Sequence, residues 1–152
     1  MRAVVQRVSQ AAVTVGDRTV GQIGVGLLVL LGVEQGDGPD DVRYIAAKIR
    51  DMRVFEDGAE PSRRLNRSVQ DVGGAVLVVS QFTLLADCRK GRRPSLAAAA
   101  LGEIARPLYD SVVSDLKSAG LAVATGEFQA MMKISLVNDG PVTLILDSRK
   151  RF

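Results

Sequence analysis

The chain has 152 residues, 47% hydrophobic and 24% charged, with a formal net charge of +3, a size and balance typical of one globular domain with a sizeable core. It contains no histidine, and Cys88 is its only cysteine, which excludes a Ser-His-Asp triad, a Cys-His pair, a two-histidine metal site and a disulfide framework. Any chemistry must therefore come from hydroxyls, carboxylates, amines, backbone groups or the substrate.

The first third of the chain has the pattern of β-strands. Apolar residues alternate over 2–8, and residues 12–15 and 19–23 flank Gly16-Asp17, a pair typical of a hairpin turn. The continuous apolar segment 27–33 predicts a strand that is covered on both faces.

A helix is predicted after Gly36, because Pro39, Asp40 and Asp41 are typical helix-start residues. The apolar residues that follow have the spacing of one helical face; they are Val42, Ile45, Ala46 and Ile49. After this helix we expect a short strand at 52–56, an exposed loop at 57–72 and a buried strand at 75–79.

A second helix is predicted between residues 95 and 119, with Gly120 as its C-terminal cap. Pro107 must lie at its start or bend it, because proline lacks the backbone donor. Its apolar face is formed by Leu108, Val112 and Leu116. Three further strands are expected at 121–124, 130–137 and 142–146. With no repeat or linker in the sequence, this order predicts an α/β domain in which two helices pack against a mixed sheet.

The longest apolar run is residues 25–33, which is far shorter than the roughly 20 residues that a membrane-spanning helix needs. The absence of cysteine pairs is typical of a reducing compartment. We therefore expect a cytoplasmic protein that does not contact membranes.

Basic residues gather in three clusters. They are Arg63, Arg64 and Arg67; Arg89, Lys90, Arg92 and Arg93; and Arg149, Lys150 and Arg151. Any one cluster could equally be a solvated loop or tail. Three together favour a polyanionic partner such as RNA or DNA, because arginine and lysine contacts to phosphate supply most of the sequence-independent affinity.

Ser80-Gln81-Phe82-Thr83 follows the predicted strand 75–79. Ligands of α/β folds tend to bind at the carboxyl ends of strands, and these side chains could donate several hydrogen bonds to a substrate carbonyl. Without further context, a strand whose hydroxyl groups bond to neighbouring backbone is the simpler interpretation.

Asn138-Asp139-Gly140-Pro141-Val142-Thr143 lies between two predicted strands. Its composition is typical of a tight turn. A Gly-Pro bond can also be cis at small cost, and a cis bond in a folded protein usually has a use. The residues alone leave both interpretations open.

These two segments resemble the two signature motifs of the D-aminoacyl-tRNA deacylase family. Four further blocks are similar to that family in the same order: residues 1–8 (MRAVVQRV), 26–33 (GLLVLLGV), 89–95 (RKGRRPS) and 133–137 (KISLV). The resemblance covers essentially the whole chain. It implies a single domain over residues 1–152, layered α/β/β, with mixed sheets and the two main helices packed on one side.

The resemblance implies hydrolysis, without metal or other cofactor, of the ester that joins a D-amino acid or glycine to the 3′-terminal adenosine of tRNA. It also implies a homodimer in which a cis Gly140-Pro141 bond enters the partner's active site. There the two carbonyl oxygens would crowd the side of Cα from which an L side chain projects, so that D-amino acids and glycine alone fit. Arg7 matches the arginine that holds this loop.

Phe128 and Met132 match positions that pack around the terminal adenine, where stacking is worth roughly 1–3 kcal/mol per base. Two neighbours depart from the family pattern, because Gln129 and Met131 stand where a glycine and an acidic residue are expected. The residues expected to contact tRNA are Arg89, Lys90, Arg92 and Arg93.

The implied catalytic residues are Ser80, Gln81, Phe82 and Thr83. Thr83 could be a nucleophile, but nothing in the sequence identifies its base, and Lys90 and Lys133 are only conceivable substitutes. We therefore favour substrate-assisted hydrolysis, in which the ribose 2′-hydroxyl orients or activates water. Thr83 would then be a positioning or oxyanion residue, and backbone amides near Phe82 and Thr83 would stabilise the oxyanion. Two other classes remain open: a threonine-nucleophile amidase or esterase for small molecules, and a non-catalytic RNA-binding module.

Overall fold

Six strands form the main sheet of the computed structural model, which describes residues 1–58 and 64–152. The strands of the described residues, including two outside the main sheet, are β1 (Arg2–Val15), β2 (Arg18–Ile23), β3 (Gly26–Gly32), β4 (Phe55–Glu56), β5 (Leu65–Arg67), β6 (Ala75–Ser80), β7 (Ala122–Thr125) and β8 (Met132–Asp147). The helices are α1 (Pro39–Asp51), α2 (Gly102–Ser118) and the 3-10 turn η1 (Phe82–Leu85). β4 and β5 form a separate two-stranded sheet.

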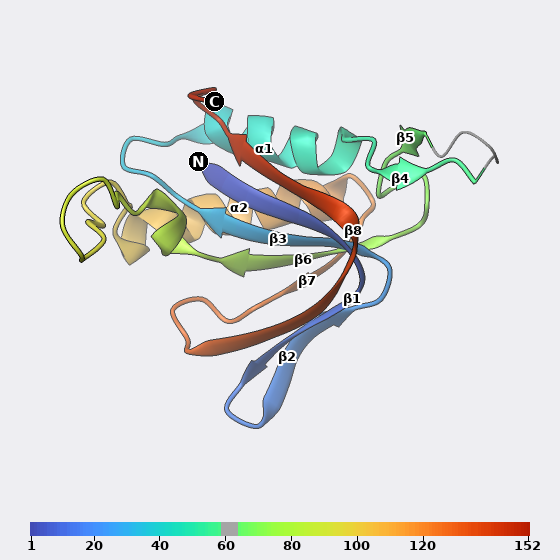
Figure 1. The fold of residues 1–152 in the computed structure, drawn as a ribbon, viewed down its shortest axis with the longest axis horizontal. Coiled ribbons are helices and arrows are strands. Elements are labelled where there is room, and N and C mark those ends of the chain that lie inside the picture. The colour runs from blue at the N-terminus through green and yellow to red at the C-terminus, as the bar shows by residue number, and fades with distance from the viewer. Residues whose placement is uncertain (59–63) are drawn as a thin grey trace.

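The long strand β1 holds the main sheet together. Its first half lies between β3 and β8, and its second half lies between β2 and β8. β3, β6 and β7 run parallel, whereas the pairs made by β1 are antiparallel. β1 and β8 bend together, so the second half of β1, β2 and the first half of β8 form a second layer (Figure 1).

Two cores lie on the two faces of β3 and β6. Leu27, Val29 and Leu31 of β3 belong to the core under helices α1 and α2. Leu28 and the β6 residues Leu77 and Val79 face the opposite way, into the core between the two β layers. This period of two is what a strand that is buried on both faces requires. The predicted layered α/β/β fold, with both helices on one side, is confirmed.

The structure corrects several predicted boundaries. β1 and β8 are each continuous, where the sequence predicted breaks at 9–11 and 138–141. Pro107 lies inside α2, which begins at Gly102. The predicted exposed loop 57–72 contains β5 and the fully buried Val69, because that side chain packs into the core under the helices. The predicted strand 52–56 is reduced to the two residues of β4.

The carboxylate of Glu34 is bound by a bidentate hydrogen bond from Arg151, at 2.8 and 2.5 Å. This guanidinium holds the pKa of Glu34 below its usual value of 4.5. A lowered folded-state pKa contributes stability that is complete above the unfolded-state pKa and is lost as the pH falls through the folded-state pKa.

Arg151→Gln is therefore expected to lower the free energy of unfolding by about 2 kcal/mol at pH 7, with the difference from wild type shrinking below about pH 4.5. Urea denaturation at pH 7 and pH 3 measures both values. Arg43→Gln, which removes an exposed ion pair with Asp40 on α1, is the control and should change stability by less than about 1 kcal/mol. Arg151 also pairs with Asp147, whose pKa it lowers as well, so a deficit of Arg151→Gln that persists unchanged at pH 3 would contradict the assignment to these two carboxylates.

Candidate functional site

Ser80-Gln81-Phe82-Thr83 lies where the chain leaves the carboxyl end of β6. Ser80 is paired with Leu31 of β3, and the Gln81 amide donates a 2.8 Å hydrogen bond to the Leu31 carbonyl. From there η1 turns away from the sheet and exposes Thr83 and Phe82, the latter 57% exposed. Figure 1 shows β3 and β6 pointing toward this end of the molecule.

The turn is held close to the sheet by small and apolar residues. A Cβ at Gly32 would lie 2.5 Å from Leu85 Cδ2 and 2.8 Å from the Gln81 carbonyl oxygen, so this position needs glycine. Leu85 is buried, and Arg2 Nη1 donates a 2.9 Å hydrogen bond to the Leu84 carbonyl. These contacts fix the backbone amides that follow Gln81.

Gln81 and Thr83 are bonded to each other. The Gln81 side-chain amide donates to Thr83 Oγ1, so the Thr83 hydroxyl proton stays available to a ligand. A carboxamide does not accept a proton as a base would. Within residues 1–58 and 64–152, no group of three or more Cys, Asp or Glu side chains could hold a metal ion. The site can therefore donate hydrogen bonds and position an ester, whereas among the described residues no carboxylate or amine side chain forms a hydrogen bond with Thr83.

Phe128 and Met132 lie at the same end of the sheet as Ser80. They follow β7, which runs parallel to β6, and the Gly126 amide donates to the Val78 carbonyl at 3.1 Å. Met132 Sδ covers Gly126, where a Cβ would be only 2.6 Å away. The structure thus brings together the two segments that were predicted to bind the ester and the adenine.

Two α2 residues that the sequence analysis did not select contact Phe128. The Tyr109 ring centroid is 5.7 Å from that of Phe128, and the Arg106 guanidinium lies 5.8 Å from the Phe128 ring. The Tyr109 hydroxyl donates to the Val78 carbonyl at 2.8 Å, and burial raises its pKa, so it remains a donor. Arg106 and Tyr109 are three residues apart on a predicted helix and so lie on one helical face. This spacing was the signal in the sequence that could have paired them with an aromatic site residue.

Gln129 has a left-handed backbone conformation, with φ of 64°. This conformation favours glycine, which is the residue that the family pattern expects here. The Gln129 side chain lies against Gly102, the first residue of α2. The departure from the family pattern therefore keeps the backbone shape of a glycine and adds a side chain at the start of α2.

Gln129→Gly is expected to raise the free energy of unfolding by about 0.5–1 kcal/mol, because it removes the penalty of a left-handed non-glycine residue. Chemical denaturation measures the change. Gln70→Gly is the control: Gln70 lies in an exposed turn and has no positive φ, so glycine should be neutral or destabilising there. Equal effects of the two substitutions would contradict this explanation.

Asn138–Thr143 forms the bend of β8, opposite the bend of β1. Arg7 is buried and donates from Nε to the Asp139 carbonyl at 2.7 Å and from Nη1 to the Val54 carbonyl at 2.6 Å. The Asn138 side-chain amide donates to the carbonyls of Arg7 and Val142. The Gly140-Pro141 peptide bond is cis, and both residues are exposed.

Within one chain this bend lies at the opposite end of the sheet from Thr83. Arg7 is paired with Leu27 of β3, whereas Ser80 is paired with Leu31. Four residues of strand correspond to about 13 Å along the strand direction, and β1 and β6 flank β3 on opposite sides. The structure therefore does not bring Gly140 and Pro141 to the Thr83 of their own chain.

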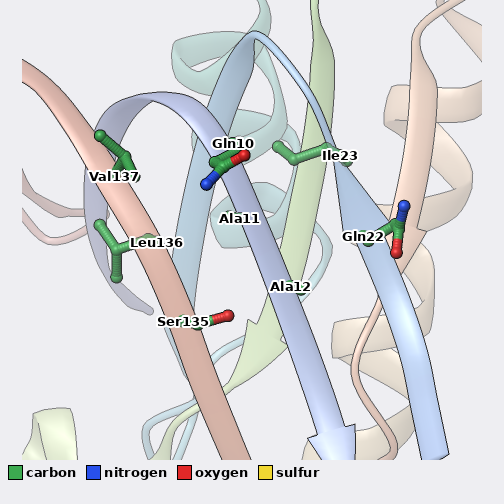
Figure 2. A pocket seen from close by; sticks show the side chains of 8 residues that line it. All are labelled: Gln10, Ala11, Ala12, Gln22, Ile23, Ser135, Leu136 and Val137. Carbon is green, nitrogen blue, oxygen red and sulfur yellow. The ribbon is translucent and has the colours of Figure 1, made fainter.

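The outer β layer has a hollow of about 280 Å³ beside the first half of β8. Its lining comes from three neighbouring strands, β8, β1 and β2, as Figure 2 shows. The lining residues are Gln10, Ala11, Ala12, Gln22, Ile23, Ser135, Leu136 and Val137. Leu136 and Val137 are among the exposed apolar residues of the molecule.

The basic clusters differ in what they contact. Arg89, Lys90, Arg92 and Arg93 are exposed on the loop that projects beyond η1. Arg89 is paired with Asp87, whereas the other three form no ion pair with the described residues. Of the first cluster, Arg64 and Arg67 are exposed, and Arg63 lies outside the described residues. The third cluster is bound within the chain, since Arg149 and Arg151 pair with Glu34, Asp37 and Asp147.

This chain is similar to known proteins over nearly its whole length. The family model described as D-Tyr-tRNA(Tyr) deacylase matches residues 4–147. Proteins named D-aminoacyl-tRNA deacylase from Syntrophotalea carbinolica and Syntrophobacter fumaroxidans are 59% and 58% identical over 152 residues, covering 100% of each chain.

Two solved structures are similar in fold. One, described as c-Myc DNA Unwinding Element Binding Protein, has a TM-score of 0.88 at 39% identity and covers 97% of this chain and 98% of its own. Another, described as a probable eukaryotic D-amino acid tRNA deacylase, has a TM-score of 0.81 at 17% identity, with 95% and 97% covered.

Proposed function

The chain belongs to the D-Tyr-tRNA(Tyr) deacylase family and is a hydrolase, and from that premise we propose how it acts. It removes the D-amino acid from D-aminoacyl-tRNA by hydrolysing the ester to the 3′-terminal adenosine, and it accepts glycyl esters as well. The observation that carries this proposal is the convergence of the Ser80–Thr83 turn with Phe128 and Met132 at one end of the parallel strands.

The turn after β6 holds the ester. The amides of Phe82 and Thr83 follow the hydrogen bond from the Gln81 amide to Leu31 and belong to exposed residues. They donate to the developing oxyanion, where one such donor is typically worth about 2.7–4 kcal/mol. Thr83 positions the ester through its hydroxyl proton, which the Gln81 contact leaves available. The ribose 2′-hydroxyl orients the attacking water, because no described base contacts Thr83.

The adenine packs against Phe128 and Met132. Lys90, Arg92 and Arg93, together with Arg89, contact tRNA phosphates from the loop beyond η1. Such contacts supply sequence-independent affinity and make binding sensitive to salt. We place this activity in the cytoplasm and assign it to residues 1–152 acting as one domain; among the described residues no helix could cross a membrane.

Chiral selection requires a second copy of the chain. The carbonyl oxygens of Gly140 and Pro141 enter the partner's site and exclude an L side chain, while Arg7 holds the bend in place. The distance of the bend from Thr83 of its own chain supports this arrangement, because only another copy could bring the two parts together.

The exposed face of β8 is the surface that a second copy would cover. Exposed apolar residues lie along β8 on both sides of the bend, and the hollow of Figure 2 continues this surface. The exposed apolar residues of β8 are Leu136, Val137, Leu144 and Ile145, of which Ile145 is 60% exposed. Exposed apolar residues gathered on one strand in this way are typical of a protein–protein interface.

The deciding experiment follows ester loss from matched D- and L-aminoacyl-tRNA. Rapid loss from the D-ester alone is expected. Equal loss from both would overturn the chiral-selection proposal. Salt-sensitive tRNA binding without ester loss would instead favour a non-catalytic nucleic-acid-binding protein, the activity named for one of the similar structures. A trapped covalent acyl group on Thr83 would favour the threonine-nucleophile class.

Mixed dimers test whether selection crosses between subunits. One chain carries Phe82→Asp, which blocks its ester site but keeps its bend, and the other carries Arg7→Gln, which loosens its bend but keeps its site. In the mixed dimer, the intact site of the Arg7→Gln chain faces the intact bend of the Phe82→Asp chain. The preference for the D-ester over the L-ester should therefore be higher than in the dimer of two Arg7→Gln chains. An unchanged preference would show that each chain selects with its own bend.

A further inference from the structure

The segment after β8 is bonded to its own chain rather than left free. The Asp147 side chain is fully buried and accepts hydrogen bonds from Arg151 at 2.7 and 3.0 Å and from Arg2 Nε at 3.3 Å. Arg151 also binds both oxygens of Glu34. Arg149 and Arg151, which belong to one of the three basic clusters that together favoured a polyanionic partner, therefore serve mainly as internal ligands.

Arg2 connects this network to the turn that carries Phe82 and Thr83. While its Nε binds Asp147, its Nη1 donates to the Leu84 carbonyl at 2.9 Å. The guanidinium is planar and rigid, so its two hydrogen bonds fix the position of the η1 backbone relative to Asp147. The Phe152 ring lies 5.7 Å from the same guanidinium and shields it.

Arg149 connects the network to the far side of the basic loop. Its Nη2 donates to the Gln35 carbonyl at 2.7 Å and pairs with Asp37 at 3.2 Å. Gln35 in turn binds the segment that follows the loop, through its amide to the Ala98 carbonyl at 2.9 Å and its side chain to the Ala97 carbonyl at 2.8 Å. Both ends of the loop that carries Arg89 to Arg93 are thus tied to one network.

We infer that Arg2, Asp147 and Arg151 are positioning residues for the active site, with Arg2 as the direct link. This inference rests on the proposed function. It adds that the hydrogen bonds of Arg2 hold the backbone amides of η1 at the distance from the ester that binding of the oxyanion requires. Arg2 does not contact the ester itself. Its loss should therefore reduce turnover more than substrate binding, because the adenine contacts at Phe128 and Met132 and the cations of the loop remain.

The test compares Arg2→Gln and Arg2→Lys with the control Arg43→Gln on α1. Deacylation of D-aminoacyl-tRNA gives kcat and KM, and hydrogen exchange gives the protection of the amides from Phe82 to Ala86. For Arg2→Gln we expect kcat to fall at least 10-fold, KM to change less than 3-fold, and exchange to accelerate at 82–86 but not in β3 or β6. Arg2→Lys keeps a charge for Asp147 but cannot reproduce the two fixed donors, so it should fold normally and still show the local exchange.

Each outcome decides the inference. Unchanged exchange at 82–86 in both Arg2 variants would overturn it, as would acceleration spread evenly over the chain, because that shows a general loss of stability. Local exchange with a fall in kcat supports it. If the wild-type chain has no deacylase activity, the proposed function fails, and the exchange pattern alone still decides whether Arg2 positions the turn.

Discussion

D-aminoacyl-tRNA that ends in 2′-deoxyadenosine should lose its amino acid roughly 10²–10⁴-fold more slowly than the natural substrate. The reason lies in what surrounds Thr83. Its described side-chain partner is the Gln81 amide, which donates to it, and the sequence contains no histidine. Because no base among the described residues is bonded to Thr83, the proposed mechanism assigns the orientation or activation of water to the hydroxyl next to the ester.

The measurement is single-turnover ester hydrolysis with excess protein, so that weaker binding does not mimic slower chemistry. Thr83→Val, which keeps the shape but removes the hydroxyl, is the matched protein variant. Substantial activity of Thr83→Val on natural substrate, together with loss of activity on the deoxy substrate, is the expected pair of results. The account fails if removal of the Thr83 hydroxyl abolishes activity while the deoxy substrate is still cleaved.

The sequence predicted the parts of the fold that depend on short-range patterns. The continuous apolar runs of β3 and β6 and the apolar spacing in α1 report burial directly, and these elements lie where they were expected. β1 and β8 were each divided in two, because Ser9-Gln10 and Asn138-Asp139-Gly140-Pro141 interrupt the apolar pattern. In the structure the two interruptions lie opposite each other, and the register shifts between Gln6 and Gln10 let both strands bend without separating.

The same distinction between short-range and long-range features holds for the predicted site. Ser80 could be placed at the carboxyl end of a strand, since it follows an apolar run, whereas Phe128 was assigned to the site through the family resemblance alone. The tie between Arg2 and Leu84 could not be predicted, because it joins residues 82 positions apart and neither has a distinctive local pattern. Arg149 and Arg151 looked like a phosphate-binding tail because two of their buried partners, Glu34 and Asp37, are far away in the sequence. Asp147 is close in the sequence, but no local pattern shows that it is buried.

Arg7→Gln should release the bend of β8 and with it the discrimination against L-esters. Arg7 donates to two carbonyls in separate segments, at Asp139 and Val54, and its guanidinium lies 5.9 Å from the Phe55 ring. Glutamine is too short to reach both, so at least one buried carbonyl loses its partner, at a cost of about 1–3 kcal/mol. The rate of hydrolysis of L-aminoacyl-tRNA should then rise at least roughly 10-fold. This corresponds to a loss of about 1.4 kcal/mol from the free-energy penalty that excludes the L-ester.

Rates on matched D- and L-esters, measured well below the unfolding temperature of the variant, separate selection from stability. Arg18→Gln removes an arginine that is 71% exposed and paired with Glu127 on the other end of the sheet, so it should leave the D/L ratio unchanged. Arg7→Lys retains the charge and one of the two hydrogen bonds, and its ratio should fall between those of wild type and Arg7→Gln. If the D/L ratio of Arg7→Gln stays at the wild-type value, the bend selects without the Arg7 side chain. Asn138 would then hold the bend, because its side-chain amide donates to the backbone carbonyls of residues 7 and 142, and these two hydrogen bonds survive the substitution.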